Sequence, residues 1–252
     1  MGYTLIFLTF GISTIAIMKL VAFFIARKSQ HPVDSRFLYM TPILCPRSHG
    51  ESFDIQIKNS DLIFELIFST LGLILAHNYL NIFFNAFTEV LFLKPYILLV
   101  FIYFFTLFLG ANLRIVASLF KIASPRIHNQ PYLSQSLSEF WGKRWNVWVR
   151  NWLGYLGKYL APKRTYLRYF LIFLISGIFH ELMVNLPYFL YTGNVLFGSM
   201  IAYFMIQFLG ICLDKAFLKN VTSLRYIFMW LVLFAPAPLF MNEAVIRFFG
   251  FN

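Results

Sequence analysis

Long apolar stretches separated by short polar segments dominate the pattern of this chain. A run of about 20 apolar residues is long enough to cross the hydrocarbon layer of a bilayer as a helix. Such runs occur at residues 3–26, 62–88, 95–120, 169–191, 195–213 and 226–246. The pattern therefore predicts an all-α, multi-pass transmembrane helical bundle of about six spans. No repeat or Gly/Ser linker divides the chain, so we expect residues 1–252 to form a single membrane-embedded domain.

Composition and charge support this class and predict an orientation. The chain is 60% hydrophobic and only 12% charged, and its mean hydropathy is +0.70. Most of its 21 lysines and arginines fall in the loops at 27–60, 121–168 and 215–225, and such loops usually face the cytoplasm. We therefore expect both termini to be non-cytoplasmic, in the endoplasmic reticulum membrane of a eukaryote or the inner membrane of a bacterium.

The net charge of +11 does not require a nucleic-acid partner. Basic residues beside apolar spans are explained by membrane orientation and by attraction to anionic lipid. We therefore expect the basic residues to interact with the bilayer, and we expect no nucleic-acid partner.

The central loop predicts an amphipathic helix. Ser136-Leu137-Ser138-Glu139 has the pattern of a capping box, which marks a helix start. Beyond it, aromatic and apolar residues recur on one face of a 3.6-residue period, at Trp141, Trp145, Trp148, Trp152, Leu156 and Tyr159. We expect one continuous helix on the cytoplasmic side.

The opposite face of this predicted helix carries Lys143, Asn146 and Arg150. A helix lying in the membrane interface, with tryptophans in the lipid boundary and cations toward headgroups, accounts for most of the pattern. It does not account for Asn146, because asparagine has a mediocre helix propensity. The cations would also attract a polyphosphate-bearing substrate such as coenzyme A.

His180 lies deep within the fourth predicted span, about 18 Å from Arg168 at 1.5 Å per residue. Ionisable residues at this depth are usually functional, although a histidine can also serve as a hydrogen-bonded contact between helices. Ser176 lies one turn earlier, where its hydroxyl could orient the imidazole, and Glu181 follows directly. A zinc motif would need a second histidine where Val184 stands, so no metal is expected. A neutral imidazole in a water-poor cavity is suited to act as a general base.

Two segments carry a family resemblance. SLSEFWGKRWN at 136–146 and SGIFHEL at 176–182 resemble, in order and spacing, the paired motifs of the membrane-bound O-acyltransferase superfamily and its wax synthase-like branch. The clear resemblance covers about residues 125–190, which we regard as the motif-bearing core. It implies an all-helical membrane enzyme that transfers an acyl group from acyl-CoA, its co-substrate, to the hydroxyl of a lipid alcohol, without a permanently bound cofactor.

The resemblance also implies roles for individual residues. The catalytic histidine of the family falls on His180 and its polar partner on Asn146. We further expect substrate-binding residues around this pair, at Trp141, Lys143, Arg144, Trp145, Arg150, Ser176 and Glu181.

Other interpretations remain open at this point. Members of the superfamily usually have more spans before the motif pair, so the chamber of this chain would be open to lipid, closed by homo-oligomerisation, or that of an inactive relative. A transporter or channel using buried His180, Glu181 and Arg114 is an alternative. A catalytically inactive membrane adaptor is another.

Overall fold

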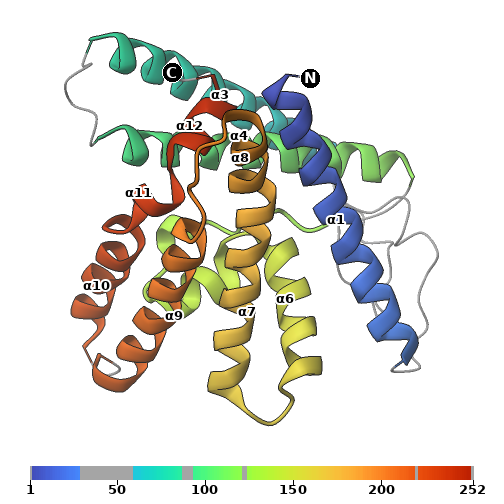
Figure 1. The fold of residues 1–252 in the computed structure, drawn as a ribbon, viewed down its shortest axis with the longest axis vertical. Coiled ribbons are helices and arrows are strands. Elements are labelled where there is room, and N and C mark those ends of the chain that lie inside the picture. The colour runs from blue at the N-terminus through green and yellow to red at the C-terminus, as the bar shows by residue number, and fades with distance from the viewer. Residues whose placement is uncertain (1, 29–58, 87–92, 121–123, 219–220, 251–252) are drawn as a thin grey trace.

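The computed structural model describes residues 2–28, 59–86, 93–120, 124–218 and 221–250. Within these ranges all regular secondary structure is helical (Figure 1). The longer helices are α1 (Tyr3–Lys28), α3 (Asn59–Ala86), α4 (Lys94–Leu119), α6 (Val147–Leu160), α7 (Thr165–His180), α9 (Ser199–Phe217) and α10 (Thr222–Phe234). Shorter elements are the 3₁₀ turn η2 (Pro131–Leu133), α5 (Leu137–Glu139), the π-helical turns η3 (Phe140–Arg144) and η4 (Glu181–Asn185), α8 (Leu186–Thr192), α11 (Ala237–Phe240) and α12 (Glu243–Phe248).

Six helical segments in the described residues are long and apolar enough to cross a membrane, which confirms the predicted class. They are Leu5–Arg27, Asn59–Ile82, Lys94–Leu119, Thr165–Thr192, Ser199–Phe217 and Thr222–Phe240. Many of their large apolar side chains point outward, such as Ile12 on α1 and Leu75 on α3, which are 68% and 69% exposed. An apolar outer surface is expected where lipid replaces water as the solvent.

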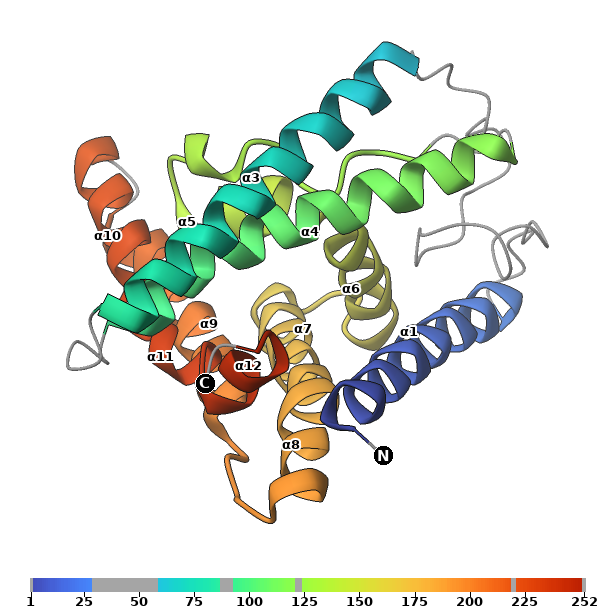
Figure 2. The same cartoon turned by 90° about the horizontal axis from the view of Figure 1, so that it is seen from above.

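The helices form two groups that meet at the centre of the molecule. The helices α6, α7, α9 and α10 extend away from the two chain ends, while α3 and α4 run side by side and crosswise to α7 (Figures 1 and 2). The N-terminal and C-terminal segments lie together, since the Tyr3 hydroxyl donates a hydrogen bond of 2.8 Å to the Ala244 carbonyl. Residues of α1, α4, α6, α7, α9 and α10 line a cavity, where the site described below lies.

The last predicted span is not one helix. We expected a helix over 226–246, whereas α10 ends at Phe234 and is followed by the short helices α11 and α12. Pro236 and Pro238 explain the break, because proline lacks the amide hydrogen that a helix interior needs. The predicted loop at 27–60 lies mostly outside the described residues, which end at 28 and resume at 59.

Candidate active site

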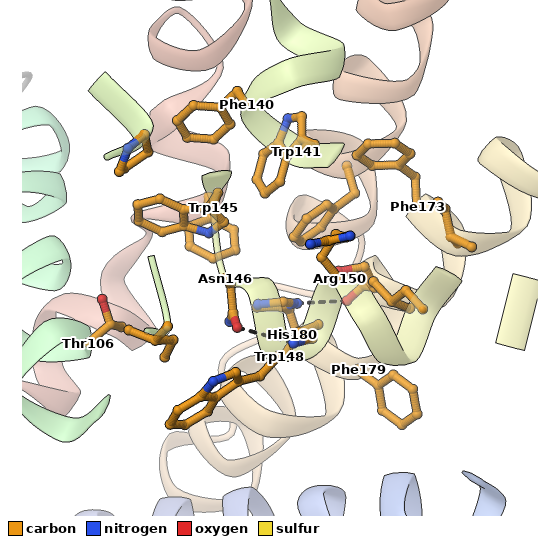
Figure 3. A pocket seen from close by; sticks show the side chains of 18 of the residues that line it. Thr106, Phe140, Trp141, Trp145, Asn146, Trp148, Arg150, Phe173, Phe179 and His180 are labelled. Carbon is orange, nitrogen blue, oxygen red and sulfur yellow. Dashed lines mark hydrogen bonds between the residues drawn. The ribbon is translucent and has the colours of Figure 1, made fainter. Parts of the chain in front are cut away.

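A cavity of about 1140 Å³ lies between α1, α4, α6, α7, α9 and α10. Its wall is mostly apolar and aromatic, and both His180 and Asn146 line it (Figure 3). These two polar side chains come from different segments, the end of α7 and the start of α6. A large apolar cavity with a few converging polar groups is the usual form of a substrate site.

The imidazole of His180 is held in one orientation by its own helix. Its Nδ1 lies 2.7 Å from the backbone carbonyl oxygen of Ser176. A carbonyl can only accept a hydrogen bond, so Nδ1 carries the proton and the neutral ring keeps its lone pair on Nε2. The rings of Phe204 and Phe240 pack against the imidazole at centroid distances of 4.8 and 5.1 Å. The predicted role of the Ser176 hydroxyl is therefore wrong, because the orienting group is the carbonyl one helical turn away.

The helix changes its geometry directly after His180. Residues Glu181–Asn185 form the π-helical turn η4, and α8 then begins with Leu186 and Pro187. Proline removes one backbone donor from the regular ladder, and π-turns inside helices often occur at functional sites. The turn places His180 and Glu181 on different sides, since His180 lines the cavity and Glu181 is not among its lining residues.

The carboxylate of Glu181 caps helix α9 instead. Its Oε1 accepts hydrogen bonds from the backbone N–H groups of Gly198, Met200 and Ile201, at 2.9, 2.9 and 3.2 Å. Its Oε2 accepts one of 2.7 Å from the Asn185 amide. A negative charge at a helix N-terminus satisfies orphan donors and complements the helix dipole. The polar pair Glu181 and Asn185 thus joins two spans next to the catalytic candidate.

Our prediction of one continuous amphipathic helix from 136 onward is wrong. The predicted N-cap at Ser136 is present, because the Glu139 N–H donates to the Ser136 hydroxyl at 3.2 Å, while the Glu139 carboxylate accepts from the Gln135 N–H at 2.9 Å. The helix then passes into the π-turn η3, which ends at Arg144, and a new helix, α6, begins at Val147. The residue between the two helices, Asn146, has a positive φ of 38°. Asparagine adopts this left-handed conformation more readily than most residues, which explains its occurrence at the break.

The break fixes the Asn146 amide at the cavity wall. Its Oδ1 accepts a hydrogen bond of 3.2 Å from the Val149 N–H and so caps α6. With the oxygen engaged in this way, the Nδ2 group is left with two donors. In the described residues these donors make no hydrogen bond, so they are available to a molecule in the cavity.

The tryptophans face the protein interior. Trp148 and Trp152 are 5% and 1% exposed, and their indole N–H groups donate to the carbonyls of Pro125 and Met18. The interface-helix interpretation required this face to lie in the lipid boundary, so it is wrong for α6. Trp141 and Trp145 precede the break and line the cavity.

The predicted cations are in three different environments. Arg150 lines the cavity, and its Nε is buried without a hydrogen-bond partner among the described residues. Burial lowers the pKa of this guanidinium below its ordinary value. Lys143 is exposed and does not line the cavity. The structure thus brings only Arg150 to the cavity.

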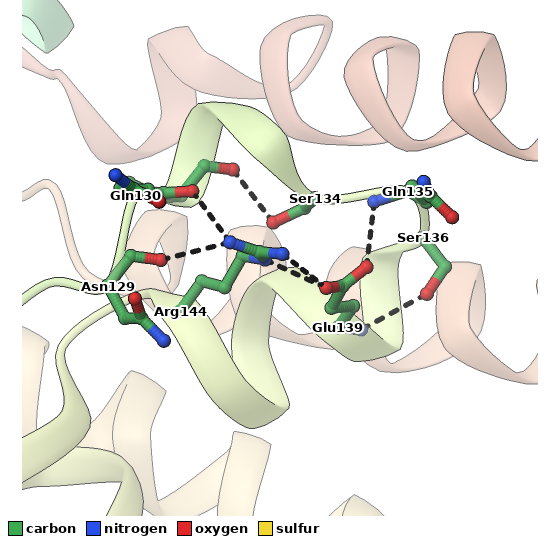
Figure 4. A network of polar contacts seen from close by, with 8 residues as sticks. Asn129, Gln130, Ser134, Gln135, Ser136, Glu139 and Arg144 are labelled. Carbon is green, nitrogen blue, oxygen red and sulfur yellow. Dashed lines mark hydrogen bonds and ion pairs between the residues drawn. The ribbon is translucent and has the colours of Figure 1, made fainter.

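Arg144 belongs to a separate polar network (Figure 4). Its guanidinium pairs with the Glu139 carboxylate at 2.8 Å and also donates to the backbone carbonyls of Asn129 and Gln130. The Glu139 carboxylate accepts a further bond from the Gln135 N–H, and that bond, together with Arg144, lowers the pKa of Glu139. Arg144 therefore fastens the loop that precedes the break and does not reach the cavity.

Sequence reasoning missed several polar residues of the site. Lys19, Lys158 and Arg168 line the cavity, and Arg168 also donates to the backbone carbonyls of Ala161 and Pro162. The signal for Lys19 was present, since it is a cation inside an apolar span. His128 was also missed, because only the fold places it beside Asn146. Its Nδ1 accepts a hydrogen bond of 3.2 Å from the Asn146 N–H.

The groups expected to form a proton path are not arranged as one. Buried Arg114 pairs with Glu65 of α3 and donates to the Ser124 carbonyl at 2.9 Å. Glu181 caps α9, as described above, and His180 contacts its own helix and two phenylalanines. Arg114 and Glu181 thus serve separate helix contacts, which removes the basis for a transporter that uses all three.

Comparison with known proteins agrees with this geometry. Residues 124–197, which contain both Asn146 and His180, match the Membrane bound O-acyl transferase family. This segment of the chain, which is less than a third of its length, is therefore similar to the membrane-bound O-acyltransferase family. The resemblance of the two motifs to this superfamily is thereby confirmed.

Its curated relatives are distant and much longer. The chain is 34% identical over 94 residues to a probable long-chain-alcohol O-fatty-acyltransferase 9 of Arabidopsis thaliana, covering 33% of this chain and 26% of the relative. It is 31% identical over 105 residues to the long-chain-alcohol O-fatty-acyltransferase of Simmondsia chinensis, covering 34% and 29%. It is 28% identical over 138 residues to diacylglycerol O-acyltransferase 1 of Dictyostelium discoideum, covering 54% and 21%. No solved structure matches the chain.

Proposed function

We propose that this protein transfers an acyl group from acyl-CoA to the hydroxyl of a lipid alcohol, with His180 as the general base. The observation that carries the proposal is that the His180 imidazole and the Asn146 amide line one largely apolar cavity within the family segment. The acceptor class is the long-chain alcohol named for the plant relatives. Diacylglycerol is the second candidate acceptor, because the chain is similar over 54% of its length to a protein named diacylglycerol O-acyltransferase 1.

The geometry of His180 supports a base at Nε2. The Ser176 carbonyl holds the proton on Nδ1, so Nε2 can take the proton of an acceptor hydroxyl. The alcohol oxygen then forms a bond to the thioester carbonyl carbon, and the carbonyl oxygen becomes an oxyanion. When the carbon–sulfur bond breaks, the coenzyme A thiolate leaves and takes up the proton from Nε2. The products are an ester and free coenzyme A, and the histidine returns to its neutral form.

Asn146 supplies a donor for the oxyanion. Its Nδ2 hydrogens are the part of the amide that the α6 cap does not engage. A pre-oriented N–H donor aimed at the developing negative charge typically contributes about 10²–10³-fold to the rate. Trp141, Trp145 and Ser176, which line the same cavity, would contact the bound acyl chain and the acceptor.

The phosphates of the donor would meet a group of cations at the cavity wall. Arg150 is the strongest candidate, because its Nε is buried and unpaired among the described residues. Lys19, Lys158 and Arg168 also line the cavity and would add positive charge. We assign Lys143 and Arg144 no direct contact with the donor, because neither lines the cavity.

The charge pattern supports an orientation for this reaction. Lys158 and Arg168 flank the turn between α6 and α7, which the distribution of lysines and arginines predicts to be cytoplasmic. We propose that acyl-CoA enters from that side, that both termini face the opposite side, and that the alcohol enters from the bilayer. Whether the protein acts as a homo-oligomer remains a prediction.

An ester-synthesis assay tests the proposal. Membranes containing the protein would be supplied with radiolabelled palmitoyl-CoA and either hexadecanol or diacylglycerol. Wild type should form a labelled ester with one of them, and His180→Ala should reduce it by about 10²–10⁴-fold. His77→Ala is the matched control, because His77 is exposed on α3 and does not line the cavity. Equal ester formation by wild type and His180→Ala would remove His180 from the mechanism, and no ester with any acceptor would reject the proposed activity.

A further inference from the structure

His128 lies in the turn-rich segment before the first motif, directly against the break at Asn146. The ring is 3% exposed. Its Nδ1 accepts a hydrogen bond of 3.2 Å from the Asn146 N–H, and its Nε2 lies 2.8 Å from the Thr106 hydroxyl on α4. His128 therefore connects a transmembrane helix to the backbone of the residue whose side chain enters the cavity.

The hydrogen bonds fix the protonation state of this ring. A backbone N–H can only donate, so Nδ1 must be the unprotonated nitrogen and Nε2 must carry the proton. The Thr106 hydroxyl can accept from Nε2, because its own hydrogen is directed to the carbonyls of Ile102 and Tyr103, at 2.9 and 3.0 Å. A neutral imidazole thus satisfies every partner, whereas an imidazolium would place an N–H against the Asn146 N–H.

The backbone on each side of His128 is also tied to the break. The Asn129 N–H donates to the Arg144 carbonyl at 2.8 Å, and the Val147 N–H donates to the Ile127 carbonyl at 2.7 Å. The Trp145 ring packs on the imidazole at a centroid distance of 4.3 Å. Two backbone hydrogen bonds and one ring contact hold the segment around His128 against the break. The hydrogen bond from the Asn146 N–H is made to the His128 ring.

We propose that His128 is a positioning residue for Asn146: it holds the left-handed backbone of Asn146 so that the side-chain amide is directed into the cavity. This inference rests on the proposed function, because it gives His128 a kinetic role only if Asn146 contacts the reacting molecule. It adds a residue outside both motifs to the machinery of the site.

The surroundings keep the ring neutral. Burial lowers the pKa of His128 to about 3. From α4 the titratable group that faces the ring is Tyr103, at a centroid distance of 5.5 Å, and from the break side it meets the Trp145 ring and the Asn146 backbone. The charged neighbours in its own segment are engaged elsewhere, Arg126 with Glu65 at 3.3 Å and Arg144 with Glu139.

Two substitutions separate the two nitrogens of the ring. An asparagine side chain places its oxygen near the position of Nδ1, so His128→Asn keeps an acceptor for the Asn146 N–H. A glutamine side chain reaches the position of Nε2, so His128→Gln keeps the Thr106 contact but loses the Asn146 bond. Both variants are neutral, polar and smaller than histidine, and each serves as the control for the other.

Both variants would be compared with wild type in the ester-synthesis assay and by hydrogen–deuterium exchange of peptides covering residues 144–150. We expect His128→Gln to lower kcat by about 10- to 100-fold with little change in KM for palmitoyl-CoA, because small misplacements of a catalytic group have effects of this size. Exchange in 144–150 should become faster. His128→Asn should restore both quantities to within about threefold of wild type, since the lost hydrogen bond is the cause.

The possible outcomes are distinct. Equal kcat for His128→Gln and wild type, or equal losses in the asparagine and glutamine variants, would overturn the inference. If wild type forms no ester, the proposed function fails, and the exchange experiment still decides whether His128 holds the Asn146 backbone. Unchanged exchange in His128→Gln would reject the positioning role even then.

Discussion

His180 and Asn146 reach the same cavity from segments that are built in different ways. His180 projects from a membrane span, and a carbonyl of its own helix holds its ring. Asn146 lies at a break between two helices, and its backbone is held by His128 from a segment earlier in the chain. The general base that we propose at His180 needs a fixed proton position, which a single local hydrogen bond provides. An amide donor needs a fixed direction, and here several residues outside its helix provide it.

The two segments also differ in how they are anchored to the rest of the molecule. The span of His180 is joined to α9 by the buried carboxylate of Glu181, which accepts four hydrogen bonds. The segment before Asn146 is joined to its neighbours by partly exposed Arg144 and Glu139. Partly exposed ion pairs contribute little to stability, while unsatisfied buried donors are costly. We therefore expect substitutions at the two anchors to have unequal effects.

The largest expected effect is at Glu181. Replacing Glu181 with alanine would leave the N-terminal amides of α9 without an acceptor, at about 1–3 kcal/mol for each buried group. We expect a loss of at least about 3 kcal/mol, seen as a clear fall in the Tm of the purified protein in detergent. Arg144→Ala is the comparison at the other anchor and should lower the Tm far less. A larger loss in Arg144→Ala would reverse the contrast between the two anchors.

The second prediction concerns the donor role of Asn146. Asn146→Asp keeps an oxygen that can cap α6 but removes the two amide hydrogens, so kcat should fall by about 10²-fold. Asn146→Gly is the control, since glycine accepts the positive φ but supplies neither donor nor cap. Both variants should lose activity to a similar degree in the ester-synthesis assay. Full activity of the aspartate variant would show that the amide hydrogens are not needed.

The smallest expected effect is the response of the Asn146 segment to pH. The pKa of His128 is about 3 in the folded chain, below the ordinary value of 6.5, because the ring is buried. The unfolded chain therefore binds the extra proton first, and stability is complete above about pH 6.5 and falls as the pH drops toward 3. The loss reaches up to about 1.4 kcal/mol per pH unit.

Thermal unfolding at pH 7 and pH 5 measures this response. The Tm of wild type should fall more between these two values than the Tm of His128→Asn, which lacks the titrating group. The other histidines are common to both proteins, so the difference isolates His128. An equal fall in both proteins would mean that His128 titrates normally in the folded state.

The sequence predicts the spans well, because a run of apolar residues long enough to cross a bilayer is a local property. It also predicts the pair His180 and Asn146, since both lie in recognisable motifs. The helix break at Asn146 escapes this reasoning because Trp148 and Trp152 continue the spacing set by Trp141 and Trp145. Asn146 itself was a local signal of the break, because asparagine readily adopts a positive φ and often caps helices.

The partners of the site could not be predicted because they are distant in sequence. Glu181 was expected to bind substrate, but its carboxylate accepts hydrogen bonds from the backbone N–H groups of Gly198, Met200 and Ile201. Only the packing of α7 against α9 brings these groups together. His128 lies outside both motifs, and the groups that it contacts belong to α4 and to the break at Asn146. Residues of this kind become visible only when helix packing is known.

Gly177 has a consequence for how the cavity can vary among related proteins. A methyl group built at this position would lie 2.8 Å from the Cα atom of Ile201, so the backbones of α7 and α9 are in direct contact. Neither helix can shift toward the other, and a larger residue at 177 would push α7, and with it His180, away from α9. We therefore expect the shape of the cavity to vary more easily through other side chains of its wall, such as Leu109 and Leu113 on α4.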